Sequence, residues 1–131
     1  MGRDYRKSGS RVHNLNYHIV FCPKYRRKCL VGDVAKRCEE LVREKCAELE
    51  ADVIALEVMP DHVHLFVAAK PDLAPSYIVN QVKGVSSRRL REEFPHLLKM
   101  PSLWTRSWYV GSVGHASDSV VQAYIENQRG K

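Results

Sequence analysis

Two histidines separated by one residue are the part of this sequence most suited to metal chemistry. His62 and His64 lie in an apolar stretch that begins just after Pro60-Asp61, a pair typical of a turn. Side chains two positions apart on a strand share a face, so both imidazoles could bind one divalent metal, whereas Val63 would point into the helices. Two histidines on an open sheet face with no ligand explain the same spacing. Asp61 could add a carboxylate to such a site, although its turn position explains it equally well.

A tyrosine and a glutamine near the C-terminus form a second candidate pair. Tyr124 and Gln128 are four positions apart, which places both on one face of a predicted helix. In an ordinary amphipathic helix the tyrosine would pack and the glutamine would be solvated. Val120, Val121 and Ile125 already supply this helix with apolar contacts, so packing does not require the tyrosine.

Basic residues gather in three groups along the chain. The groups are Arg3, Arg6, Lys7 and Arg11; Lys24, Arg26, Arg27 and Lys28; and Lys83, Arg88, Arg89 and Arg91. Tyr25 lies within the second group, and an aromatic ring among cations suits contact with a nucleic-acid backbone combined with base stacking. One such group could be an ordinary solvated surface, but three favour nucleic acid as the partner.

The composition is that of a basic globular domain. Of 131 residues, 44% are hydrophobic and 27% are charged, which argues against disorder and fibrous repeats. Lys and Arg total 21 against 15 Asp and Glu, a formal charge of +6 that favours an anionic partner such as nucleic acid or a membrane surface. We expect a single domain over residues 1–131, with a basic N-terminal arm over 1–13.

Membrane, secreted and zinc-finger classes fit the sequence poorly. No stretch reaches the roughly 18–20 uncharged apolar residues that cross a bilayer, and the polar N-terminus is unlike a signal peptide. The four cysteines form no C-x-x-C pair, and Cys38 and Cys46 match apolar positions of a predicted helix. We therefore expect a reduced, cytoplasmic setting in which the cysteines serve packing.

Alternating strands and helices are predicted to position these residues. Strands are expected over residues 14–22, 52–59, 62–69 and 103–113, and helices over 33–49, 77–94 and 118–128. Asp33 and Ser117 are the expected N-caps of the first and last helices, and the second begins just after Pro75. The first six elements follow the ferredoxin-like or RRM-like split βαβ order, an α+β fold whose antiparallel sheet has two helices on one face.

Together these features resemble the single-tyrosine HUH transposases of small single-stranded-DNA insertion sequences, the TnpA-like and REP-associated transposases. HUH denotes His-hydrophobic-His, which His62-Val63-His64 fits. Residues 124–128, YIENQ, fit the family's helix in which the nucleophilic Tyr precedes a Gln by four positions. The other fitting segments, in the family's order, are residues 16–26 (NYHIVFCPKYR), 59–61 (MPD) and 83–86 (KGVS).

The resemblance implies metal-dependent cleavage of DNA by Tyr124. The tyrosine would attack single-stranded DNA at hairpin-marked insertion-sequence ends, giving a 5′-phosphotyrosine and a free 3′-OH that permit rejoining. His62, His64 and Gln128 would hold the divalent metal, Mg²⁺ with Mn²⁺ able to substitute, with Asp61 as a further ligand or a partner of one. No nucleotide cofactor is expected, because bond energy is conserved and the sequence lacks a phosphate-cradling glycine motif.

The resemblance also implies a mode of assembly and a DNA ligand. Family members are homodimers with edge-joined sheets, in which the nucleophile helix, here residues 117–129, can complete the partner's metal site. Gly111 and Gly114 would give the preceding connection the freedom this requires. The expected ligand is single-stranded DNA held by the basic residues. The protein is expected in a prokaryotic cytoplasm, acting at the nucleoid. The expected contacts are Lys24, Tyr25, Arg26, Arg27, Lys28, Lys83, Arg88, Arg89 and Arg91.

Two other functions remain compatible with these features. A relative recruited by its host would have the same chemistry but no mobile element of its own. A non-catalytic RRM-like module would recognise RNA through aromatic residues on its central strands. Such residues are scarce here, since the predicted strand 52–59 has none and 62–69 has only Phe66.

Overall fold

The computed structural model describes residues 15–112 of the chain. In order, this part contains β1 (Leu15–Phe21), η1 (Lys24–Arg26), α2 (Gly32–Glu48), β2 (Asp52–Met59), β3 (His62–Ala69), α3 (Pro75–Glu93), η2 (Pro95–Lys99) and β4 (Tyr109–Ser112), where η marks a 3₁₀ turn. The predicted basic arm, the predicted helix with Ser117, Tyr124 and Gln128, and Gly114 lie outside the described residues.

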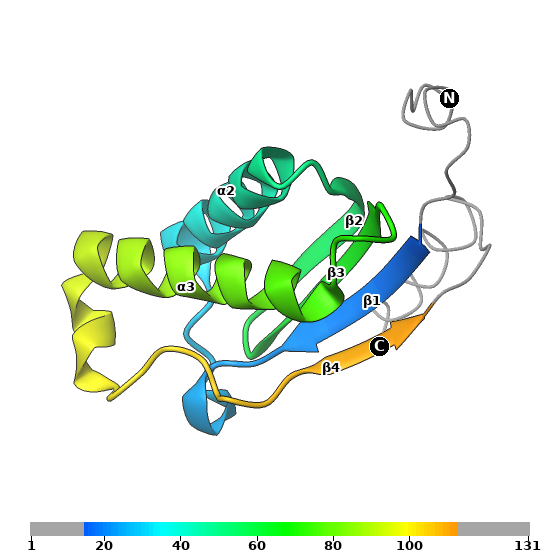
Figure 1. Ribbon diagram of the computed structural model, residues 1–131. Helices are drawn as coiled ribbons and strands as arrows, with labels where there is room; N and C mark the ends of the chain where they lie inside the picture. The colour runs from blue at the N-terminus through cyan, green and yellow to red at the C-terminus, as the bar shows by residue number, and fades with distance from the viewer. Residues whose placement is uncertain (1–14, 113–131) are drawn as a thin grey trace.

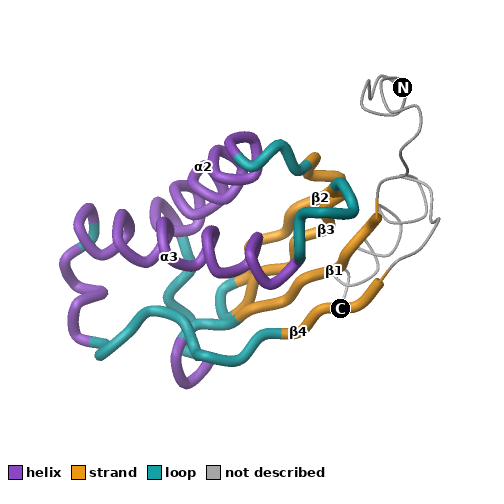
Figure 2. Tube along the Cα trace, viewed as in Figure 1, coloured by secondary structure: helices purple, strands orange, loops and turns teal. Residues whose placement is uncertain are grey.

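Four antiparallel strands form the sheet of the described region, in the order β2-β3-β1-β4. The central strands β1 and β3 pair with Ile19 opposite Leu65 and Val20 opposite His64. β2 continues the sheet beside β3, with Glu57 opposite His64, and β4 lies beside β1. Helices α2 and α3 lie side by side over one face of this sheet (Figures 1 and 2). This is the predicted α+β architecture with the split βαβ strand order.

The hydrophobic core fills the space between the sheet and the two helices. Its fully buried side chains from the sheet include Ile19, Phe21, Val63, Leu65 and Val67, and those from the helices include Cys38, Val42, Cys46, Ile78, Val82 and Leu90. Cys38 and Cys46 are free thiols. Burial raises the pKa of each thiol to about 12, so both serve packing, as the sequence predicted.

The first helix begins slightly earlier than predicted. The expectation that Asp33 is the N-cap is wrong, because α2 starts at Gly32 and its N-cap is Val31. Asp33 instead lies in the first turn, where its negative charge is favourable at the positive end of the helix dipole. Gly32 has a φ of +58°, a left-handed conformation that glycine adopts without steric cost.

The last strand is shorter than the predicted 103–113. An isolated bridge pairs Trp104 with Pro23, through backbone hydrogen bonds from Lys24 to Leu103 and from Thr105 to Cys22. Residues 105–108 lie between this bridge and the start of β4, whereas only residues 21 and 22 lie between the bridge and Val20 on the paired strand. The four-residue segment therefore bulges out of register with β1.

Side-chain contacts hold this irregular segment in place. Leu103 is fully buried, and the indole N–H of the buried Trp104 donates to Ser86 Oγ at 3.0 Å. The Lys83 ammonium donates to the carbonyl of Thr105 at 2.7 Å, so that carbonyl bonds a side chain rather than a neighbouring strand. Apolar residues that look like a strand in the sequence are therefore core contacts of a loop.

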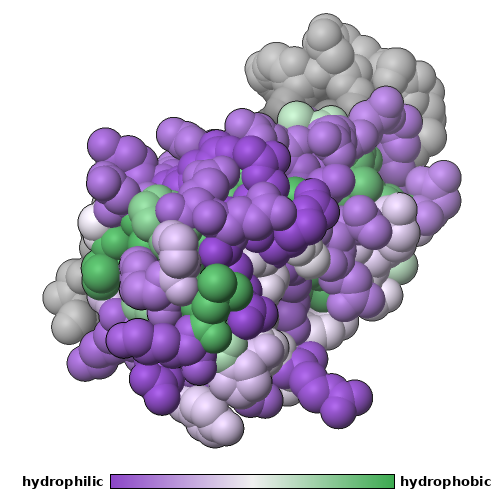
Figure 3. All heavy atoms as spheres, turned by 90° about the vertical axis from the view of Figure 1, so that its left-hand side faces the viewer, coloured by the Kyte–Doolittle hydropathy of each residue, from purple (hydrophilic) through white to green (hydrophobic). Residues whose placement is uncertain are grey.

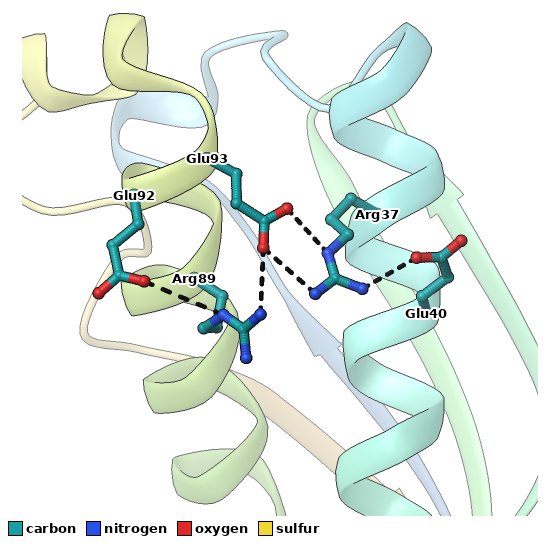
Figure 4. A network of polar contacts seen from close by, with 5 residues as sticks. All are labelled: Arg37, Glu40, Arg89, Glu92 and Glu93. Atoms are coloured by element: carbon teal, nitrogen blue, oxygen red, sulfur yellow. Dashed lines mark hydrogen bonds and ion pairs between the residues drawn. The ribbon is translucent and has the colours of Figure 1, made fainter.

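An ion-pair network joins the exposed sides of α2 and α3 (Figure 4). Arg37 donates to both carboxylate oxygens of Glu93, at 2.9 and 3.2 Å, and to Glu40 at 3.0 Å. Arg89 contacts the same Glu93 at 3.3 Å and Glu92 at 4.0 Å. The hydrogen bond from Arg37 foremost holds the pKa of Glu93 below its usual range. Because the network is exposed to water and salt, it adds less stability than the core does.

Hydrophilic side chains cover most of the surface at the end of the molecule that Figure 3 faces. Hydrophobic atoms appear there as separate patches rather than as one continuous surface. None of the helices within residues 15–112 has the length and apolar character needed to cross a bilayer.

Two adjacent leucines of η2 provide a test of the core. Leu97 is 2% exposed and Leu98 is 58% exposed. We expect Leu97→Ala to lower the free energy of unfolding by about 2–5 kcal/mol, because it leaves a cavity. Leu98→Ala should change it by less than about 0.5 kcal/mol. Urea unfolding followed by circular dichroism measures both, and equal losses would contradict the packing of η2 against the core.

Candidate functional site

The two predicted histidines lie on the face of the sheet opposite the helices. Val63 and Leu65 of β3 are fully buried under the helices, so the residues that alternate with them point the other way. The rings of His62 and His64 are adjacent there, with centroids 4.8 Å apart and planes at 82°. The structure therefore brings together the pair whose spacing predicted a shared face.

Asp61 forms a hydrogen bond with the ring of His62. The Nδ1–H of His62 donates to Asp61 Oδ1 at 2.7 Å, and Arg26 Nη2 donates to Asp61 Oδ2 at 3.0 Å. The hydrogen bond from His62, followed by that from Arg26, lowers the pKa of the Asp61 carboxyl below its ordinary value. Both carboxylate oxygens are thus engaged by side chains, and the contact uses Nδ1 of His62 rather than Nε2.

His18 is the residue at this site that sequence analysis missed. Its Nε2 lies 2.9 Å from Nδ1 of His64, and its ring stacks on Phe66 with centroids 4.2 Å apart. The sequence predicted a strand over residues 14–22, which includes His18, but did not place this residue next to His64. That neighbourhood follows from the register of β1 on β3, which no local pattern specifies.

Burial keeps the imidazoles of His18 and His64 neutral at neutral pH. Burial foremost, with the neighbouring histidines, lowers the pKa of His64 to about 4, although the charge of Glu57 opposes the shift. Burial also lowers the pKa of His18. A neutral imidazole carries a lone pair on one ring nitrogen, which is the form that binds a metal.

These residues fit part of a divalent metal site. Since Asp61 and His18 contact the Nδ1 atoms, the Nε2 atoms of His62 and His64 are the nitrogens left for a metal. Across residues 15–112, however, no three His, Cys, Asp or Glu side chains are grouped so as to hold a metal ion. A complete site needs further ligands, and the predicted one, Gln128, lies outside the described residues, as does Tyr124.

The basic turn after β1 is connected to the histidines through Arg26 and Asp61. Tyr25 at its tip is 72% exposed, with the Lys24 ammonium 5.7 Å from its ring centroid. Tyr25 and Arg26 have φ angles of 59° and 52°, a costly conformation for residues other than glycine that is frequent at functional sites. Arg27 and Lys28 complete this exposed surface.

Several basic residues of α3 that were predicted to contact DNA already have partners within the chain. The Lys83 ammonium donates to the Thr105 carbonyl, and Arg91 Nη2 donates to the Met100 carbonyl at 2.8 Å. Arg89 is paired with the glutamates of the interhelical network, whereas Arg88 is exposed. Among the predicted contacts, the basic turn is therefore better placed for an external anion than this helix.

Gly111 has a structural role different from the predicted one. It lies in β4 opposite His18, and a Cβ there would be 2.6 Å from the hydroxyl oxygen of Tyr109. The ring of Tyr109 also meets the edge of His18, with centroids 6.0 Å apart. The expectation that Gly111 gives freedom to a connection is wrong, because the residue is part of the paired sheet and makes room for Tyr109.

Comparison with known families and proteins gives a consistent result. A family model described as "Transposase IS200 like" matches residues 11–128. The ISDra2 transposase TnpA of Deinococcus radiodurans is 37% identical over 129 residues, covering 96% of this chain and 92% of that protein. The transposase of insertion sequence element IS200 from Salmonella typhimurium is 32% identical over 118 residues, covering 88% of this chain and 77% of that protein.

Solved structures show the same fold. A chain from Deinococcus radiodurans R1, described as a candidate transposase, has a TM-score of 0.74 and 39% identity, covering 89% of this chain and 92% of its own. A REP-associated tyrosine transposase, solved bound to a REP hairpin, has a TM-score of 0.62. It is 12% identical, covering 85% of this chain and 63% of its own, so it supports the fold alone.

The neutral state of His64 predicts that stability falls as pH drops from about 6.5 to about 4. In the unfolded chain His64 takes up a proton near its ordinary pKa of 6.5, whereas the folded chain holds it neutral until about pH 4. The unfolded state binds more protons in this window, so acidification favours unfolding.

Urea unfolding across this window, with a chelator present, measures the effect. We expect His64→Gln, which does not titrate, to lose part of the pH dependence. Ring NMR of the folded protein should place the midpoint of His64 protonation near pH 4. A midpoint near 6.5 would contradict the burial of His64 as a neutral group.

Proposed function

Since this chain belongs to the family of IS200-like transposases, we propose that it cleaves and rejoins single-stranded DNA at hairpin-marked insertion-sequence ends. In this proposal Tyr124 is the nucleophile, and His62 and His64 bind a divalent metal. The observation that carries it is the pair of adjacent imidazoles, each contacted at Nδ1, on the face of the sheet opposite the helices. The family match spans these histidines as well as Tyr124 and Gln128, and the proposal assigns all four to one site.

Each residue of the proposed site has a separate role in the reaction. His62 and His64 would hold the metal through Nε2, with Gln128 as a third ligand. A bound Mg²⁺, or Mn²⁺ in its place, supplies Lewis acidity at the scissile phosphate. The hydroxyl of Tyr124 attacks phosphorus and loses its proton, the bond from phosphorus to the 3′ oxygen breaks, and that oxygen leaves as a 3′-OH. The resulting 5′-phosphotyrosine keeps the bond energy, so a second 3′-OH can reverse the step and release Tyr124.

The DNA strand is proposed to approach the histidines over the basic turn formed by residues 24–28. This turn presents an exposed aromatic ring, Tyr25, among cations, which suits stacking of an unpaired base beside a held phosphate. Arg26 connects the turn to His62 through Asp61. The REP-associated tyrosine transposase was solved with a REP hairpin bound. For this chain, a hairpin that marks the site is part of the proposal.

We further propose that residues 1–131 form one domain that works as a homodimer with edge-joined sheets. Among the described strands, β2 and β4 form the sheet edges, and an edge strand offers backbone groups that can pair with a second chain. The predicted helix over 117–129 would complete the metal site, in its own subunit or in the partner.

The burial of Phe66 argues against a non-catalytic RRM-like module. Phe66, the aromatic residue of β3 on the face opposite the helices, is 3% exposed, and the ring of His18 stacks on it. RRM-like recognition requires aromatic rings on which bases can stack. The one aromatic residue of β3 is therefore not available for such stacking.

A covalent protein–DNA adduct is the expected product of the first step. Labelled single-stranded DNA with candidate hairpin ends, incubated with the protein and Mg²⁺ or Mn²⁺, should give an adduct that survives denaturant. Tyr124→Phe should abolish it, because phenylalanine has no hydroxyl. Tyr77→Phe, which alters an exposed tyrosine on α3, is the matched control and should retain it. An undiminished adduct in Tyr124→Phe would contradict the nucleophile assignment.

The same assay tests the metal ligands. A chelator, His62→Ala or His64→Ala should each abolish the adduct, whereas His96→Ala, at an exposed histidine of η2, should not. Full activity of Gln128→Ala would remove that residue alone from the ligand set.

Salt dependence tests the role of the basic turn. Arg27→Gln and Lys28→Gln should each weaken binding of single-stranded DNA. Each should also reduce the slope of log affinity against log salt by about 0.7 for every phosphate that the variant no longer neutralises. Arg43→Gln is the matched control, since Arg43 lies on α2 and pairs with Glu39 at 3.2 Å. Fluorescence anisotropy over a salt series measures the slopes. If Arg27→Gln and Lys28→Gln have the same slope as Arg43→Gln and the original protein, the turn does not hold DNA.

A further inference from the structure

His18 lies next to His64 on the face of the sheet opposite the helices. In the register of β1 on β3, His18 is opposite Phe66 and Val20 is opposite His64, so His18 reaches His64 along the diagonal. The facing atoms, Nε2 of His18 and Nδ1 of His64, are 2.9 Å apart. This is hydrogen-bond distance for two ring nitrogens.

Packing holds the ring of His18 in this position. It stacks on Phe66 with centroids 4.2 Å apart and planes at 4°. Tyr109 meets its edge from β4, with centroids 6.0 Å apart and planes at 75°. Because two aromatic neighbours fix the ring, its Nε2 remains aimed at His64.

We propose that His18 accepts a hydrogen bond from the Nδ1–H of His64 and thereby fixes the tautomer in which Nε2 of His64 carries the metal-binding lone pair. His18 is thus a positioning residue, acting on the metal through His64. The inference rests on the proposed function, because it concerns the same metal site.

The direction of this hydrogen bond follows from the chemistry of two neutral imidazoles together with the proposed role of His64 as a metal ligand. Of two facing nitrogens, one must carry the proton and the other must accept it. If His64 accepted at Nδ1, its own proton would sit on Nε2, and no lone pair would remain there for a metal. If His64 donates from Nδ1, its Nε2 is free of a proton. Only this second arrangement suits a metal ligand.

His62 provides an internal comparison. The Asp61 carboxylate can only accept, so the 2.7 Å contact places the proton of His62 on Nδ1 and its lone pair on Nε2. Metal-binding histidines generally donate their second ring N–H to such a partner, which orients the ring. Asp61 and His18 therefore act as equivalent supports, one charged and one neutral, for two histidines in the same tautomer.

The tautomer of His64 in metal-free, full-length protein is the first test. Nitrogen-15 NMR of the histidine rings, recorded with a chelator present, distinguishes a protonated from an unprotonated ring nitrogen. We expect His64 to be protonated at Nδ1 and unprotonated at Nε2. A proton on Nε2 would overturn the inference, whatever the protein does with metal.

Two substitutions at position 18 test the consequence for metal binding. His18→Phe keeps a ring stacked on Phe66 but removes the acceptor, so the dissociation constant for Mn²⁺ without DNA should rise by about 10- to 100-fold. His18→Gln keeps an acceptor near the position of Nε2 and should recover most of the affinity. His96→Phe, at an exposed histidine of η2 away from the sheet, is the matched control and should bind Mn²⁺ as the original protein does. Equal affinity of His18→Phe and the original protein would overturn the inference.

Failure of the proposed metal site would give a different pattern. In that case His64→Ala would bind Mn²⁺ as well as the original protein, while the metal-free spectra would still decide the tautomer. If His18→Phe does not fold, as judged by circular dichroism, the tautomer and the affinity of His18→Gln decide the inference. An affinity of His18→Gln as weak as that expected for His18→Phe, in a folded chain, would count against an acceptor at this position.

Discussion

The alternation of side chains along β3 is the constraint on which the rest of the structure depends. Val63, Leu65 and Val67 are fully buried under the helices, so His62 and His64 must point to the opposite face of the sheet. A slip of one residue in register would bury both imidazoles and expose the apolar side chains. The burial that stabilises the sheet therefore also positions the histidines, and the site needs no separate framework to hold its two rings together.

Hydrogen bonds from neighbouring segments orient the two imidazole rings that β3 places side by side. Asp61, in the turn before β3, contacts His62, and His18, on the next strand, contacts His64. Arg26 extends the first of these contacts to the basic turn after β1. This arrangement places the exposed basic turn beside the pair of imidazoles that we propose as metal ligands. In the proposed function, the face opposite the helices carries the chemistry, while the helix-covered face supplies stability.

Local patterns predicted most of the fold, because the signals that define it are local. The turn at Pro60 and Asp61 separates two apolar runs, and the structure places β2 and β3 at the predicted bounds. The predicted last strand was too long. Trp104 looks like a strand residue in the sequence, but it fills the core from a loop and makes only an isolated bridge to Pro23. His18 escaped notice because its role depends on strand register. Tyr124 was singled out by its spacing from Gln128 and by resemblance, and its place in the site remains a prediction.

The most direct test of this account is the position of a metal ion relative to the ring nitrogens of His62 and His64. Anomalous scattering from crystals soaked in Mn²⁺ would locate the ion without reference to activity. The account predicts a single ion bound to Nε2 of both histidines, with Nδ1 of His62 still against Asp61 and Nδ1 of His64 still against His18. An ion bound through either Nδ1, or bound away from both rings, would contradict it.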